Sequence, residues 1–439
     1  MPYNIIIGRD DSDKKKFGEK GLVKIGKGYV KMGQYTSLSN PIYLDVSRSH
    51  VILVAGKRGS GKSYTLGAIA EEISMLPEEV SKNISPVIFD TMGIFWTMKY
   101  ENEKEKRLLE EWNLKPKKVP IKVFAPFGYF NEYLEKGVAV DEPFAIKVSE
   151  LTSEDWILIF NLKITDPIAI LLEKVIYSIN ENKELFDIDE IIKRIFEDKT
   201  STQDNKNALI SLFEGAKTWG IFANKNQKET KMQDLLTPGV STIIDLSTYN
   251  SIGAFNIRAL VIGLVCKKIF NERTDARKKE EIDSLRHGID YLSFDQSREV
   301  PLVWIFIDEA HEFLPKEGQT LATDSLIQIL REGRQPGISL VLATQQPGQI
   351  HKDVMTQSDI VISHRLTSLP DITALNEIMQ TYLFGSIKQY IDELPRLKGS
   401  AIILDDNSER IYPLRIRPRF TWHGGETPTS IKTEKSELI

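Results

Sequence analysis

One cysteine, Cys266, occurs among the 439 residues of this chain, which excludes a disulfide within it. The cysteine lies in an apolar run, residues 260–270, that is typical of a helix, so we expect a buried thiol without a chemical role. Histidine is scarce too, with six scattered residues and no HExxH motif. The sequence therefore gives no support to a cysteine nucleophile or to a zinc site.

Long hydrophobic runs are also missing. No apolar stretch approaches the roughly 18 residues that span a bilayer, and residues 1–9 lack the layout of a secretion signal. We therefore expect a soluble, cytoplasmic protein without a membrane partner. Positive charge is not in excess, since the net charge is −5. This argues against a surface coated with basic residues, so any contact with nucleic acid must be local, as in the pore of a ring of subunits.

What the sequence does contain is a complete phosphate-binding loop of the form GxxxxGK[ST]. It consists of Gly56, Lys57, Arg58, Gly59, Ser60, Gly61, Lys62 and Ser63. The apolar run 51–55 before it predicts a buried strand, and the apolar spacing in 64–75 after it predicts a helix. A plain glycine turn, the competing interpretation, does not explain this flanking pattern.

In that setting the backbone N–H groups converge on an anion at the helix N-terminus. We expect Lys62 to reach the β- and γ-phosphates of a bound nucleotide and Ser63 to hold Mg²⁺. Residues 56–63 and the following Tyr64 are thus the predicted nucleotide-binding residues.

Further apolar runs alternate with helical patterns, which predicts an α/β protein with a parallel, doubly wound sheet. The predicted strands are 86–90, 121–125, 240–246, 303–307, 339–343, 360–362 and 400–404. The predicted helices between them include 255–270 and 321–332, whereas the charged stretch 271–299 is expected to be a mobile excursion.

The same pattern divides the chain into parts. Residues 1–48 are expected to be a short β-rich segment with a solvated turn at the lysines 14–16. The core that contains the phosphate-binding loop comprises 49–126 and 238–423, and 424–439 is expected to be a polar, flexible tail. The core is interrupted by a helical insertion, 127–237, with predicted helices at 153–162, 168–179, 188–196 and 206–217.

Candidate catalytic residues follow the predicted strands, and sites in open α/β sheets form at the carboxyl ends of strands. After strand 303–307 come Asp308, suited to orient Mg²⁺, and Glu309, suited to polarise an attacking water. A mere turn is the alternative. For His311 we expect a supporting hydrogen bond rather than metal binding.

Two further segments are suited to phosphate chemistry. Gln345 follows strand 339–343, and an uncharged donor there can sense the γ-phosphate, although an amide capping the turn before Pro347 is the alternative. Arg331 and Arg334 follow a predicted helix. An arginine there can neutralise a γ-phosphate bound by an adjacent subunit, while ordinary charges at a helix C-terminus are the alternative.

These segments, in this order, resemble the HerA branch of the FtsK–HerA superfamily of ring-forming ATPases. The resemblance covers most of residues 40–425 and rests on 56–63, Asp90, 307–315, 331–337, 343–347, 363–366, 415–419 and 422–425. It implies a RecA-like P-loop ATPase core that uses ATP and Mg²⁺. It also implies a homo-hexamer that translocates on or unwinds double-stranded DNA in its central pore, with a nuclease or other effector protein as a possible partner.

The resemblance also implies roles for individual residues. Glu309 becomes the acid that activates water, Gln345 the γ-phosphate sensor and Arg334 the arginine finger that acts in trans. A weaker expectation is that Arg417, Arg419 and His423 line the same junction between subunits.

The sequence departs from the family pattern at two places. About 50 residues precede the phosphate-binding loop, whereas family members commonly carry a longer β-barrel there. After the second strand, Ile94 stands where the family usually has the glutamate of an Asp-Pro-x-Gly-Glu turn, so whatever that glutamate does must be lost or replaced.

Three functions are compatible with these patterns. The first is a DNA-translocating motor, and the second is a nucleotide-dependent hexameric scaffold that regulates a protein effector. The third, a packaging or secretion motor at a membrane, is disfavoured by the lack of a membrane segment. Basic residues at the predicted excursion can face a pore or simply be solvated; they are Arg273, Arg277, Lys278 and Lys279, with Lys316 nearby.

Overall fold

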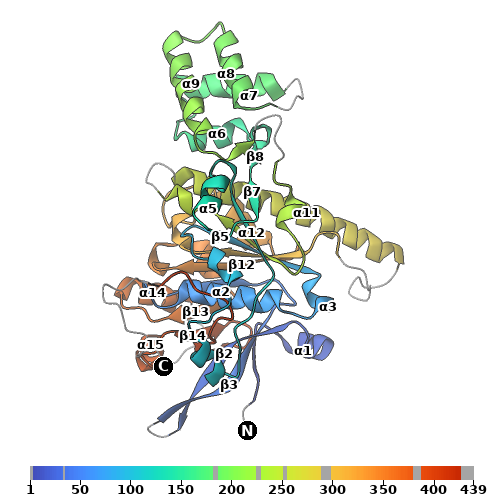
Figure 1. Cartoon of the computed structure of the whole chain (residues 1–439), viewed down its shortest axis with the longest axis vertical. Helices are drawn as coiled ribbons and strands as arrows, with labels where there is room; N and C mark the ends of the chain where they lie inside the picture. Colours follow the sequence, from blue (N-terminus) through green and yellow to red (C-terminus); the bar gives the residue numbers. More distant parts are fainter. Residues whose placement is uncertain are drawn as a thin grey trace.

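The computed structural model describes residues 3–32, 35–180, 186–223, 229–250, 255–287, 298–378 and 387–426. Within these residues, one 13-stranded sheet of order β1-β3-β2-β15-β14-β13-β4-β12-β11-β5-β10-β6-β7 forms the body of the molecule (Figure 1). Its strands are β1 (Ile5–Ile7), β2 (Leu22–Met32), β3 (Tyr35–Asp45), β4 (Val51–Ala55), β5 (Ile84–Asp90), β6 (Ile121–Pro126), β7 (Glu142–Phe144), β10 (Ser241–Asp245), β11 (Leu302–Ile307), β12 (Ile338–Thr344), β13 (Ile360–His364), β14 (Ser400–Asp405) and β15 (Arg410–Ile416).

The sheet has a parallel part and a mainly antiparallel part. From β13 through β4, β12, β11, β5, β10 and β6 to β7 every pairing is parallel. These strands are rich in apolar residues, and β5 and β12 are buried along their whole length, as expected where helices cover both faces of a sheet. The expected α/β class with a largely parallel sheet is confirmed.

The N-terminal strands extend this same sheet, because β2 pairs antiparallel with β15. Between β1 and β2 lies a helix, α1 (Asp11–Phe17). Asp10 is its N-cap and accepts a hydrogen bond from the backbone N–H of Asp13. The lysines 14–16 therefore belong to a helix, and the expectation of a turn there is wrong.

Two hydrophobic clusters occupy the two faces of the sheet, because successive side chains of a strand point to opposite faces. Leu53 belongs to the cluster formed with α11 (Phe255–His287) and α12 (Thr323–Glu332), whereas Ile52 and Val54 belong to the cluster formed with α2 (Lys62–Ser74). Apart from the four helices described in the next paragraph, the remaining α-helices are α3 (Glu78–Ser81), α4 (Lys106–Glu111), α5 (Phe130–Glu135), α10 (Met232–Leu235), α13 (Lys352–Gln357), α14 (Leu369–Ile378) and α15 (Ile387–Glu393).

The predicted insertion helices are confirmed, with ends that differ by up to three residues. They are α6 (Ser153–Ile159), α7 (Pro167–Asn180), α8 (Ile188–Glu197) and α9 (Gln203–Lys217), and they stand above the sheet in Figure 1. Their core includes the buried Trp156, whose ring lies 4.9 Å from that of Phe213. A two-stranded sheet of β8 (Ile146–Lys147) and β9 (Phe222–Ala223) lies at their base.

The expectation of a mobile excursion from 271 to 299 is wrong for residues 271–287, where α11 continues as a helix. Arg273 explains much of this, since its buried guanidinium donates to the carbonyl oxygens of Pro336 at 2.8 Å and Val300 at 2.7 Å. Arg277 pairs with Glu281 one turn on, which supports the helix locally. Residues 288–297 lie outside the described residues. Among the helices that the structure describes, each is too short or too polar to cross a bilayer.

After β15 the chain returns across α2 as a segment that we call the C-terminal strap, residues 417–426. The carboxylate of Glu71 in α2, which is fully buried, holds this strap. It accepts hydrogen bonds from Arg417 Nη1 and Nη2 at 3.0 Å, from Arg419 Nε at 3.0 Å, from the backbone N–H of Phe420 at 2.9 Å and from both the backbone and hydroxyl of Thr421.

Electrostatics favours this cluster despite its burial. Burial alone raises the pKa of Glu71, but the charges of Arg417 and Arg419 and the bonds from Thr421 and Phe420 outweigh it, so the pKa lies below its usual value. Gly67 leaves room for the Arg419 guanidinium, since a Cβ there would lie 2.5 Å from Arg419 Cζ. Arg417 and Arg419 are both 0% exposed, so the expectation that they line a subunit junction is wrong.

We expect Glu71→Ala to lower the free energy of unfolding by about 3–5 kcal/mol, because it leaves two buried guanidinium groups without their carboxylate. Glu79→Ala is the matched control, since its exposed pair with Lys20, at 3.2 Å, is worth at most about 1 kcal/mol. Urea unfolding of both variants measures the difference. Equal losses would contradict the structural role of Glu71.

Candidate active site

The phosphate-binding loop joins the carboxyl end of β4 to α2, and its glycines are required by its shape. Gly59 and Gly61 have φ angles of 73° and 112°, in the left-handed region that favours glycine. At Gly56 a Cβ would lie 2.7 Å from Cβ of His364. The loop can therefore bend closely around an anion at the start of α2.

Lys62, Ser63 and Asp308 meet at this point. Ser63 Oγ donates a hydrogen bond to Asp308 Oδ2, and Lys62 Nζ lies 3.5 Å from the carbonyl oxygen of Lys57. Burial lowers the pKa of Lys62 against the opposing charges of Glu309 and Asp308. Burial, followed by the charge of Glu309, raises the pKa of Asp308. The site thus holds one cation and two carboxylates in a small buried volume.

Glu309 and Gln345 are in direct contact. The Gln345 amide donates to Glu309 Oε1, while Glu309 Oε2 is buried and has no hydrogen-bond partner among the described residues. The backbone of Glu309 is left-handed, with φ 50°, a conformation that costs of order 1 kcal/mol or more for such a residue. The surrounding structure therefore holds this carboxylate in a particular direction.

His311 lies behind these groups. Its Nδ1 is 3.2 Å from Thr344 Oγ1 and 3.7 Å from Glu309 Oε2. In the part of the chain that the structure describes, no group of three or more His, Cys, Asp and Glu side chains is placed to hold a metal ion. The contact between His311 and Thr344 is the supporting hydrogen bond that was expected for His311.

The two arginines before β12 lie apart from this cluster. Arg331 Nε bonds Asp353 at 2.6 Å, so Arg331 forms an ion pair near the end of α12. Arg334 is exposed and precedes the amino end of β12, whereas the phosphate-binding loop is at the carboxyl edge. A seven-residue strand separates the two edges by about 20 Å. Arg334 therefore lies far from the phosphate-binding loop of its own protomer.

The basic residues of α11 differ in their exposure to solvent. Arg273 is fully buried, so the expectation that it faces a pore is wrong. Lys278 and Lys279 are exposed and pair with Asp275 at 3.5 Å and Glu299 at 3.2 Å. They are thus exposed to solvent, as the alternative interpretation expected, but they lie on a helix and not on the expected loop.

A cavity of about 640 Å³ adjoins the phosphate-binding loop. Its lining comes from the loop and α2, from α4, from the turn before β14, and from β15 and the strap; the residues are Gly59, Gly61, Lys62, Ser63, Tyr64, Glu105, Leu108, Trp112, Lys398, Gly399, Arg415, Ile416, Pro418, His423, Gly425 and Glu426. Sequence reasoning missed Glu105, Trp112 and Lys398, since no motif marks them and only the fold brings them to the loop.

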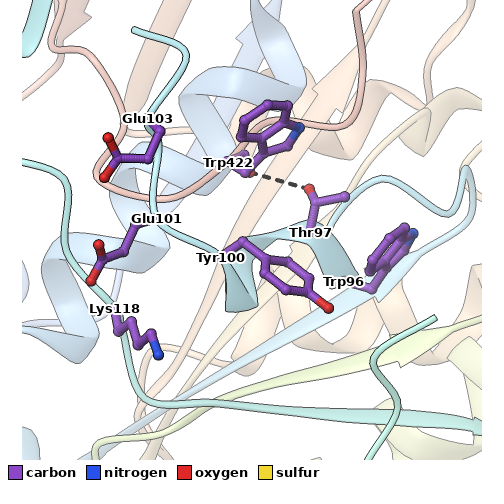
Figure 2. A pocket seen from close by; sticks show the side chains of 7 residues that line it. All are labelled: Trp96, Thr97, Tyr100, Glu101, Glu103, Lys118 and Trp422. Carbon is purple, nitrogen blue, oxygen red and sulfur yellow. Dashed lines mark hydrogen bonds between the residues drawn. The ribbon is translucent and has the colours of Figure 1, made fainter. Parts of the chain in front are cut away.

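A second cavity, of about 480 Å³, lies beside the strap. Figure 2 shows its lining residues: Trp96, Thr97, Tyr100, Glu101, Glu103, Lys118 and Trp422. Thr97 Oγ1 donates to the carbonyl oxygen of Trp422 at 3.1 Å, which joins the strap to the segment after β5. The two cavities share none of their lining residues.

Asp90 and Asp245 form a buried carboxylate pair at the ends of β5 and β10, where they are register partners. Asp90 accepts hydrogen bonds from the backbone N–H groups of Met92, Gly93, Ile94 and Phe95, so it organises the turn that contains Ile94. The side chain of Ile94 packs against the apolar cluster of α2. Burial, and then the charge of Asp245, raises the pKa of Asp90 to about 7.

Comparisons with known proteins agree with these motifs. The sequence model of a family described as "Helicase HerA, central domain" matches residues 30–269, and that of the zonular occludens toxin (Zot) matches residues 172–369. A Pyrococcus furiosus protein named "DNA double-strand break repair helicase HerA" is 26% identical over 184 residues, which cover 38% of this chain and only 31% of that protein.

Two other similarities cover most of the chain. A Methanocaldococcus jannaschii protein named "Probable helicase MJECL08" is 23% identical over 97% of this chain and 76% of its own length. The structure of VirB4 of Thermoanaerobacter pseudethanolicus superimposes with a TM-score of 0.55 and 11% identity, covering 90% of this chain and 96% of VirB4. This superposition shows that the two chains share a fold.

We expect Asp245→Asn to raise the unfolding temperature at pH 8 and to have little effect at pH 4. The folded-state pKa of Asp90 is about 7, above the ordinary 3.8. Between these two pH values the folded protein therefore keeps a proton that the unfolded chain has lost. Stability contributed by Asp90 is therefore present at low pH and lost as the pH rises through about 7. Each kcal/mol of repulsion removed at pH 8 should raise the midpoint by about 2–4 °C.

Thermal unfolding followed by circular dichroism at the two pH values measures this effect. Glu317→Gln, at an exposed position outside the helices and strands, is the control and should shift neither midpoint. An equal shift of Asp245→Asn at both pH values would show that charge repulsion with Asp90 is not its cause.

Proposed function

Since the chain belongs to the family of the HerA helicase central domain, whose sequence model covers residues 30–269, we propose that it is an ATP-hydrolysing motor that acts on DNA. The resemblance inferred from the motifs is confirmed by this match. The observation that carries the proposal is the gathering of Lys62, Ser63, Asp308, Glu309 and Gln345 at one edge of the sheet, beside a cavity of about 640 Å³.

The loop end of the cavity is suited to bind a triphosphate. Its backbone N–H groups at the start of α2 and the ammonium group of Lys62 supply positive potential. Ser63 Oγ and Asp308 Oδ2 are adjacent oxygen donors of the kind that Mg²⁺ prefers, so these residues would hold that ion. When bound, Mg²⁺ supplies neutralisation of phosphate charge.

Glu309 is suited to act as the general base. Its Oε2 has no hydrogen-bond partner among the described residues, so it can accept a proton from a water aimed at the γ-phosphorus. Gln345 holds the other oxygen of the same carboxylate and can exchange that contact for one to the γ-phosphate. Glu309 is therefore the proposed base, and Gln345 the proposed sensor.

In finer detail, we propose a homo-hexamer that moves or unwinds double-stranded DNA in its pore, with Arg334 reaching the nucleotide of the next protomer. The exposure of Arg334 at the edge opposite its own loop supports a role in trans. A contact between the amino edge of one sheet and the carboxyl edge of the next is head-to-tail. Such contacts close into a ring when the rotation from one protomer to the next permits it. The HerA name of the Pyrococcus furiosus relative also supports DNA as the track.

A nucleotide-dependent hexameric scaffold for a protein effector is the second candidate. The insertion favours it, because several large apolar side chains there are exposed: Leu158 51%, Ile164 70%, Ile170 56%, Tyr177 67% and Phe196 60%. Exposed large apolar side chains in one part of the chain are compatible with a protein partner. The same partner is compatible with the motor, so the two candidates differ in whether DNA changes the hydrolysis rate.

We expect Lys62→Ala to abolish ATP turnover, because it removes the cation that faces the phosphates. Glu309→Gln should bind ATP but hydrolyse it about 10²–10⁴-fold more slowly, since an amide cannot accept the proton. Phosphate release with and without duplex DNA measures both effects. DNA should stimulate the unmodified protein if it is a motor and leave its rate unchanged if it is a scaffold, and a fully active Lys62→Ala protein would contradict both functions.

Arg334→Ala subunits should retain nucleotide but lose roughly 10³-fold or more in hydrolysis, as expected for an arginine finger. Arg331→Ala is the control, because Arg331 bonds Asp353 and should not affect hydrolysis. Mixing Arg334→Ala with Glu309→Gln subunits should restore activity, since some junctions then combine an intact Glu309 with an intact Arg334. No recovery in mixed oligomers, verified by mass measurement, would rule out sites shared between neighbours.

A further inference from the structure

The cavity beside the phosphate-binding loop has an end that phosphate binding leaves unexplained. Lys62 and Ser63 lie at one end, whereas Leu108, Trp112 and Pro418 contribute apolar surface to the same lining. Tyr64 and His423 add two rings to it, with centroids 5.2 Å apart and planes inclined at 78°. A triphosphate requires donors and cations, not this apolar and aromatic wall.

The ring of His423 is held in one protonation state. Arg419 Nη1 lies 3.2 Å from His423 Nδ1, and a guanidinium can only donate, so Nδ1 accepts. Burial, and then the charge of Arg419, lowers the pKa of His423 to about 3, so the imidazole is neutral at physiological pH. The hydrogen of the neutral ring must therefore be on Nε2, where it is available as a donor.

The ring of Tyr64 is held equally firmly. Its hydroxyl donates to Glu105 Oε2 at 2.6 Å and accepts from the backbone N–H of Arg419 at 2.7 Å. Asn102 Nδ2 also donates to Glu105 Oε2, at 2.9 Å. The hydroxyl of Tyr64 is thus committed to the protein. The ring also lies near the Arg419 guanidinium, whose Cζ is 5.8 Å from the ring centroid, and it is the ring that remains to contact a ligand.

The wall that carries His423 is itself built to stay in place. The strap is tied to α2 through Glu71, so it is fixed to the helix that begins in the phosphate-binding loop. Gly425 lies against the ring, since a Cβ there would be 2.8 Å from Cε1 and 2.9 Å from Nε2 of His423. Even one added methyl group at position 425 would therefore displace the imidazole.

We propose that this end of the cavity is the nucleoside subsite, in which an aromatic base packs against Tyr64 and His423 while His423 Nε2–H donates a hydrogen bond to a ring nitrogen or ribose oxygen. The inference rests on the proposed function, because it takes the loop end as the triphosphate site. Tyr64 directly follows Ser63, so the wall begins where the nucleoside must leave the first turn of α2.

Calorimetric titration with ATP and with inorganic tripolyphosphate tests this assignment. His423→Ala should weaken ATP binding by about tenfold, as expected for the loss of one stacking partner, and should leave tripolyphosphate binding unchanged. His423→Phe keeps a ring but removes the donor, so it should lose less affinity for ATP than His423→Ala does. Lys62→Ala should weaken the binding of both ligands, because it acts at the phosphates.

The outcomes separate the two proposals. Unaltered ATP binding by His423→Ala, or an equal loss for both ligands, would overturn the nucleoside subsite while leaving the phosphate site intact. Unaltered binding of both ligands by Lys62→Ala would instead overturn the proposed function. If His423→Ala unfolds at lower temperature than the unmodified protein, Gly425→Ala replaces it, because its Cβ would press on the imidazole and residue 425 makes none of the contacts to Glu71. Gly425→Ala should then show the same selective loss of ATP.

Discussion

The parallel register of β4, β12 and β11 is the constraint on which the candidate site depends. Ala55 is the register partner of Thr344, and Leu342 is the partner of Ile307, so the three strands end at one edge. The residues that follow each strand therefore meet although they are far apart in sequence. Ser63 contacts Asp308 across 245 positions for this reason. A shift of one residue in either pairing would turn every side chain of a strand to the other face and separate these groups.

A second constraint fixes the wall opposite the phosphate-binding loop. Glu71 lies in α2, the helix that begins in the loop. Its carboxylate binds two arginines and two backbone N–H groups of the strap. Two buried guanidinium groups around one carboxylate are costly unless nearly every donor is used, and most of these are. The arrangement makes the end of the chain part of the same rigid unit as the loop, so the cavity between them has a defined shape.

Local motifs were enough to predict the parts of the fold and site that are encoded locally. The loop at 56–63, the strand ends at Asp308 and Gln345 and the four insertion helices each carry their signal in adjacent residues. The charged half of α11 was misjudged because its polar residues satisfy one another and bury Arg273 against distant carbonyl groups. Arg417 was misjudged because its partner Glu71 lies 346 positions away, and no local pattern identifies such a pair.

The position of Arg334 bears on the geometry of any assembly that completes the site. It lies at the amino edge of the sheet, and Glu309 lies at the carboxyl edge about 20 Å away. In a two-fold dimer, if Arg334 of one protomer met Glu309 of the other, then the reverse contact would form as well. One interface would then have to cover both edges of the sheet at once. A head-to-tail contact needs only one such meeting and leaves the other edge for the next protomer. A role for Arg334 in hydrolysis therefore favours a ring over a dimer.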